Sequence, residues 1–145
     1  MDNQQSGNIE MIGPAGEYGR LLDAANVCLL CCLLDDGLSI LWASNCFYQK
    51  TGYAREEYQR LFQTVRQYYA DYPDDFLTMK KLLEQDSQTA RPTVPFPKKD
   101  GVIGSVQLAW SFAEKSLEGR RVCYLCLLYT SARKEREGGS PKPFQ

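Results

Sequence analysis

Histidine is absent from this 145-residue sequence, and its absence excludes several kinds of chemistry. A histidine-ligated haem is excluded, and so is a serine or cysteine nucleophile activated by histidine. No Gly-x-x-x-x-Gly-Lys loop is present to cradle phosphates. The adjacent acids Glu56-Glu57 and Asp74-Asp75 are expected at helix starts, where the helix dipole and solvent stabilise their charges. We therefore predict that the chain is not an enzyme.

A strong net charge and a long apolar run are also missing. The formal net charge is −1, which argues against binding to nucleic acid or to an anionic membrane surface. No apolar run approaches the roughly 20 residues of a membrane span, and the polar start of the chain has no signal-peptide pattern. The length of 145 residues suits a single hydrophobic core. These features predict one cytoplasmic domain.

Cysteine is well represented, with six residues. The pairs Cys28-x-x-Cys31 and Cys123-x-x-Cys126 have the spacing of a paired metal knuckle. The residues between them are apolar and belong to expected strands, where positions three apart point to opposite faces. We therefore expect buried, reduced cysteines, with a redox or metal role as the alternative.

The first half of the chain changes between helical and extended patterns. An amphipathic helix is expected over residues 15–25, a buried apolar strand over 27–34 and a partner strand over 38–42. Ser44 is a good helix N-cap and Gly52 a good helix stop, so a helix of about two turns is expected between them. A second short helix is expected directly afterwards, because acidic residues there would lie near its N-terminal end.

The second half begins with an aromatic-rich connection and a helix that starts at Pro73. Strands are expected over residues 93–97, 102–113 and 121–130. The first carries two prolines, which fits an edge strand. The second alternates apolar and polar residues, so one face should be buried, and the third is apolar on both faces. The predicted fold is therefore α+β, with the order β-β-α-α-α-β-β-β behind an N-terminal helix.

The segment from Ile40 to Glu57 resembles the PAS (Per-Arnt-Sim) sensory domain family. Its strand ends in an aromatic residue, and a Thr-Gly-Tyr tripeptide and an acidic pair follow in the family's order. Phe47 falls on the phenylalanine of the family's Asn-x-x-Phe pattern, while Ser44 takes the place of the asparagine. Because serine and asparagine cap helices about equally well, this departure should leave the local geometry intact. The resemblance covers residues 15–134.

The resemblance implies a five-stranded antiparallel sheet with helices on one face, in which the first and last strands are central neighbours. Residues 1–14 are then expected to form a flexible arm, and residues 135–145 a disordered linker or tail. When the family binds a ligand, it does so between the sheet and the helices. The side chains that could line such a pocket, or simply fill it as core, are Phe47, Tyr53, Phe62, Phe76, Met79, Leu108, Trp110 and Phe112.

The identity of a cofactor stays open at this stage. Asn45-Cys46 is similar to the flavin-adduct pair of the family's light-oxygen-voltage branch. In that branch the pair follows the Thr-Gly-Tyr tripeptide, whereas here it precedes it. A flavin photoadduct is therefore disfavoured.

By resemblance, the chain is expected to be a cytosolic sensory module and a fragment of a larger signalling protein. It would bind a small molecule or a partner and relay a change to an output domain, such as a sensor kinase or a cyclic-dinucleotide enzyme. The alternatives are a ligand-free PAS dimerisation module and, less favoured, a cysteine-based redox or metal sensor. A homodimer is expected through the helix at 15–25 and the outer sheet face, because helices cover only one side of the sheet.

Overall fold

The computed structural model describes residues 17–86 and 90–128. The predicted arm at residues 1–14 and the predicted tail at 135–145 lie outside these ranges. Within the described part of the chain, no helix is both long enough and apolar enough to cross a membrane.

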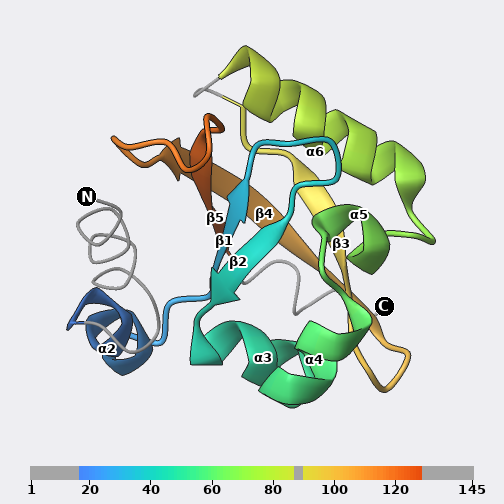
Figure 1. The fold of residues 1–145 in the computed structure, drawn as a ribbon. Helices are drawn as coiled ribbons and strands as arrows, with labels where there is room; N and C mark the ends of the chain where they lie inside the picture. The colour runs from blue at the N-terminus through green and yellow to red at the C-terminus, as the bar shows by residue number, and fades with distance from the viewer. Residues whose placement is uncertain (1–16, 87–89, 129–145) are drawn as a thin grey trace.

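Five strands form one antiparallel sheet in the order β2-β1-β5-β4-β3 (Figure 1). They are β1 (Leu29–Leu33), β2 (Ile40–Ala43), β3 (Thr93–Pro97), β4 (Ile103–Phe112) and β5 (Val122–Leu128). The predicted five-stranded sheet is confirmed, and its first and last strands pair at the centre. Their residues alternate between the faces, so Leu30 and Cys32 join the main core while Cys31 and Leu33 face the other side.

The helices between β2 and β3 pack on one face of the sheet, and α2 precedes β1 (Figure 1). They are α2 (Glu17–Ala24), α3 (Asn45–Thr51), α4 (Arg55–Leu61), α5 (Val65–Tyr68) and α6 (Pro73–Gln85). The sequence pattern did not predict α5, which lies in the aromatic-rich connection. It begins with a capping box, in which the side chains of Thr64 and Gln67 each bond the other's backbone.

The junction between β2 and α3 is set by Ser44 and Gly52. Ser44 occupies the expected N-cap position, but its side chain does not cap the helix. Instead, its Oγ donates to the carbonyl of Val27 (2.6 Å) and accepts from the N–H of Leu29 (3.0 Å). Gly52 ends α3 as predicted, with φ of 85° and its N–H bonded to the carbonyl of Tyr48. The buried serine therefore ties the start of α3 to the start of β1.

Strand β3 is an edge strand, as its two prolines predict. The hydroxyl of Tyr69 donates to the carbonyl of Pro95 (2.7 Å), and that of Tyr68 donates to the carbonyl of Pro97 (2.5 Å). Both tyrosines belong to the α5 region, so this part of the helical layer is bonded to the edge of the sheet.

The outer face of the sheet carries a smaller apolar cluster, made of buried Cys31, Leu33, Trp42 and Val122. Leu22 of α2 packs against this cluster, as expected for the N-terminal helix. The preceding residue Leu21 behaves differently, because its side chain is 64% exposed. Helix α2 thus covers part of the outer face and leaves a leucine in solvent.

Candidate ligand-binding core

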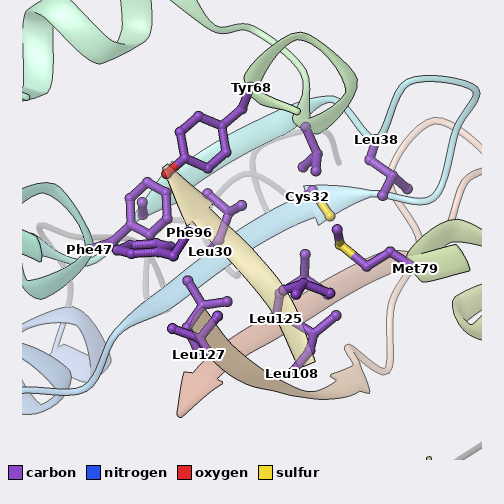
Figure 2. Packing of buried hydrophobic residues seen from close by; sticks show 14 of the residues in the cluster. Leu30, Cys32, Leu38, Phe47, Tyr68, Met79, Phe96, Leu108, Leu125 and Leu127 are labelled. Carbon is purple, nitrogen blue, oxygen red and sulfur yellow. The ribbon is translucent and has the colours of Figure 1, made fainter. Parts of the chain in front are cut away.

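Aromatic rings gather where α3, α4 and α5 meet the sheet. We call this set the aromatic cluster; its members are Phe47, Tyr48, Tyr53, Tyr58, Phe62, Tyr68, Tyr69 and Phe96. Tyr58 lies near its centre, with ring centroids 5.2 Å from Phe47 and 4.9 Å from Phe62. Most of these pairs meet edge to face, the arrangement that the ring quadrupoles favour. Figure 2 shows Phe47, Tyr68 and Phe96 side by side in this region.

The hydroxyl of Tyr58 is buried without a hydrogen-bond partner. The residue is 1% exposed, and burial raises the pKa of its phenol well above the ordinary value. By contrast, the neighbouring Tyr68 and Tyr69 place their hydroxyls on proline carbonyls of β3. Leaving a buried donor unpaired costs about 1–3 kcal/mol, so this unused O–H is a cost to the folded protein that a hydrogen-bond acceptor would remove.

The other candidate residues lie toward the α6 side of the same core. Leu108 and Trp110 alternate inward from β4 as predicted, and Phe76 and Met79 of α6 are buried against the same cluster. The indole Nε1 of Trp110 is a second buried donor that lacks a partner. Phe112 is only half-buried, and the guanidinium of Arg121 lies over its ring, 3.6 Å from the ring centroid.

All eight residues singled out from the sequence therefore belong to one core or pack against it. Phe47, Tyr53 and Phe62 join the aromatic cluster, whereas the remaining five lie outside it. Tyr53 also lines a surface pocket of about 490 Å³ beside α3 and α4. Whether these residues hold a ligand stays a prediction.

Sequence reasoning missed Tyr58, the residue with the unused hydroxyl. The signal that could have found it is spacing: Tyr58 lies four residues before the aromatic Phe62, which directly follows α4, and residues four apart along a helix lie on the same side of it. Phe96 was missed because it stands between two prolines in a strand that reads as a solvent edge.

The cysteines divide between the two faces of the sheet. Cys28, Cys32 and Cys123 belong to the main core, while Cys31 lies in the outer cluster. This separates the two thiols of Cys28-x-x-Cys31, as the strand geometry predicts. Burial raises the pKa of the Cys31 thiol to about 12. Among the described residues, no group of three His, Cys, Asp or Glu side chains is placed to hold a metal ion.

No protein-family model matches the sequence, and no curated protein sequence matches it. Solved structures do. A PAS domain from a two-component sensor histidine kinase is 22% identical, with 74% of this chain and 88% of that chain covered and a TM-score of 0.52. A fungal LOV-domain photoreceptor is 18% identical, with 72% of this chain and 74% of that chain covered and a TM-score of 0.57.

A further match is the LOV protein of Rhodobacter sphaeroides, which is 11% identical, with 81% of this chain and 69% of that chain covered and a TM-score of 0.52. Identities this low bear on the fold alone. The strand order, the helices on one face and these matches agree, and the chain has the fold of the PAS domains.

Proposed function

We propose that this chain is a non-catalytic PAS-type sensory module. It binds a small molecule in its core and relays the change to an output domain elsewhere in a larger signalling protein. The observation that carries the proposal is the unused hydroxyl of Tyr58 inside the aromatic cluster. A filled apolar core gains nothing from an unpaired donor, whereas a ligand with an acceptor would satisfy it.

The chemistry of the aromatic cluster indicates the class of ligand. Its members are uncharged, and their rings offer faces and edges for stacking. The hydroxyl of Tyr58 supplies one donor and requires an acceptor. We therefore expect an uncharged, at least partly aromatic molecule with a carbonyl or ring-nitrogen acceptor. Charged ligands are disfavoured, because a buried ion requires a counter-charge and every member of the cluster is uncharged.

Native mass spectrometry and electronic absorption of the purified protein test this proposal first. A bound organic mass supports it directly. If the protein purifies empty, a thermal-shift screen of uncharged aromatic compounds follows, with Tyr58→Phe as the diagnostic variant and Tyr69→Phe as its control. We expect a stabilising compound to lose affinity in Tyr58→Phe and to keep it in Tyr69→Phe. Equal binding to both variants would remove Tyr58 from the site.

A second candidate function is self-association, which the exposed Leu21 on α2 favours. Leu21 is 64% exposed beside the outer cluster, and Leu128 at the end of β5 is 39% exposed. Two copies of the chain could cover these leucines by pairing their α2 helices about a two-fold axis.

Light scattering across a concentration series tests this, with Leu21→Lys expected to shift a dimer toward monomer. Leu77→Lys is the matched control, because Leu77 is 54% exposed on α6, which packs on the other sheet face. A wild-type monomer at high micromolar concentration would rule the dimer out.

A further inference from the structure

The carboxylate of Asp23 in helix α2 is bonded to the start of α3. The backbone N–H of Asn45 donates to Oδ1 of Asp23 (3.0 Å), and the side-chain amide of Asn45 donates to Oδ2 (2.8 Å). Asp23 comes from α2, and Asn45 is the first residue of α3. Ser44 does not cap α3, so a side chain from a different helix takes over this role. The acceptor is a carboxylate and both of its oxygens are used, which makes the contact stronger than a neutral hydrogen bond.

The contact continues into α4. The guanidinium of Arg55 donates to Oδ1 of Asn45 and also lies over the ring of Tyr48, 4.9 Å from its centroid. Arg55 is the first residue of α4, and Tyr48 belongs to the aromatic cluster. A chain of polar contacts therefore runs from α2 through the starts of α3 and α4 to a ring of the core.

The bonds of Ser44, which lies next to Asn45, differ from those of Asp23 and Arg55 in their burial. The side chain of Ser44 is buried and bonds Val27 and Leu29 at the start of β1, whereas the bonds of Asp23 and Arg55 are exposed to solvent. Asn26, with φ of 58°, joins α2 to this anchored segment. Across Asn26, the N–H of Val27 donates to the carbonyl of Leu22 (2.9 Å), so the last turn of α2 is held to the anchored segment. Exposed bonds open more readily than buried ones, so the contacts of Asp23 and Arg55 open first while β1 stays fixed.

We propose that Asp23, Asn45 and Arg55 form a releasable latch that couples the packing of the α3–α4 layer to the position of α2. A shift of α3 relative to α4 breaks the bridge at Asn45 and frees α2, which then withdraws Leu22 from the outer cluster. The latch deepens the proposed sensory function by giving the core a route to the N-terminal helix. The latch can be tested in ligand-free protein, so a failed search for a ligand would not contradict it.

Hydrogen–deuterium exchange of the full chain, resolved at the amides of α2, measures release of the latch. An eight-residue helix is marginal in water once undocked, so exchange in α2 reports its detachment. We expect roughly tenfold faster exchange in Asp23→Ala and a smaller acceleration in Asp23→Asn. Amides of the central strands should not change, because the Ser44 anchor remains. Asp71→Ala removes the same charge from an exposed loop and should leave α2 unchanged.

The coupling to α4 has its own test, because Arg55 donates to Asn45 and reaches α2 through that residue. We expect Arg55→Ala to accelerate exchange in α2 several-fold, and to have no further effect in an Asp23→Ala background. Arg60→Ala is the control on the same helix. Unchanged exchange in Asp23→Ala would overturn the latch, and unchanged exchange in Arg55→Ala would overturn the coupling. Acceleration in either control variant would show that surface charge alone is responsible and would overturn both.

Discussion

Replacing Tyr58 by phenylalanine should stabilise the ligand-free protein, although the change removes a polar group from a well-packed core. The hydroxyl is buried and has no partner, and the ring contacts with Phe47 and Phe62 do not involve it. Its desolvation costs about 1–3 kcal/mol in the folded state. The small void that the lost oxygen leaves offsets part of this gain, so we expect a net increase of about 1 kcal/mol in the free energy of unfolding.

Urea unfolding measures this change. With a slope of about 1–3 kcal/mol per molar urea, the midpoint should rise by roughly 0.3–1 M at an unchanged slope. Native mass spectrometry of the same sample must show no bound ligand. Tyr69→Phe is the matched control, because the hydroxyl of Tyr69 donates to the carbonyl of Pro95. The free energy of unfolding of this variant should fall by about 1 kcal/mol. If Tyr58→Phe loses stability as Tyr69→Phe does, the Tyr58 hydroxyl has a partner and the reasoning behind the ligand site fails.

Three further predictions concern the core and the fold. Trp110→Ala should lower the free energy of unfolding by about 3–5 kcal/mol, because it leaves a large cavity beside Leu108; a loss below about 1 kcal/mol would contradict its inward placement. Gly52→Ala should lower the free energy of unfolding by about 1 kcal/mol or more, because φ is 85° there, whereas Gly104→Ala in β4 should be tolerated. Equal urea midpoints for the two variants would argue against the left-handed helix stop. Burial raises the pKa of the Cys31 thiol from 9.0 to about 12, so its contribution to stability is present below pH 9 and is lost as the pH rises toward 12. In Cys31→Ala, the free energy of unfolding should therefore fall less steeply with pH between 9 and 12. An unchanged dependence on pH would refute this.

The parts of the fold that follow from short-range sequence were predictable. The α3 helix and its stop at Gly52 depend on residues within one turn of each other, and the pattern gave both. The alternation along β4 placed Trp110 inward for the same reason. Helix α5 could also have been predicted, because Thr64 and Gln67 stand at the spacing of a capping box.

The parts that depend on distant partners were not predictable from pattern. Ser44 reads as a helix cap, yet it bonds backbone groups of Val27 and Leu29, because the antiparallel β1–β2 pairing brings these residues beside it. Asp23 reads as a solvated acid on an amphipathic helix, and its role at Asn45 depends on where α2 docks. The unpaired hydroxyl of Tyr58 was not predictable either. Only the packed structure shows that the hydroxyls of the neighbouring Tyr68 and Tyr69 bond carbonyls of β3 and leave that of Tyr58 without a partner.

The prolines of β3 also decide how this sheet can meet another chain. In the antiparallel pairing with β4, backbone bonds join Pro92 to Leu108 and Lys98 to Val102, so positions 95 and 97 turn their backbone groups away from β4. There, proline offers no N–H, and the carbonyls of Pro95 and Pro97 already accept the hydroxyls of Tyr69 and Tyr68. A foreign strand would find neither donors nor free acceptors at these two positions. At these two positions the β3 edge is therefore protected against strand addition and the aggregation that follows from it.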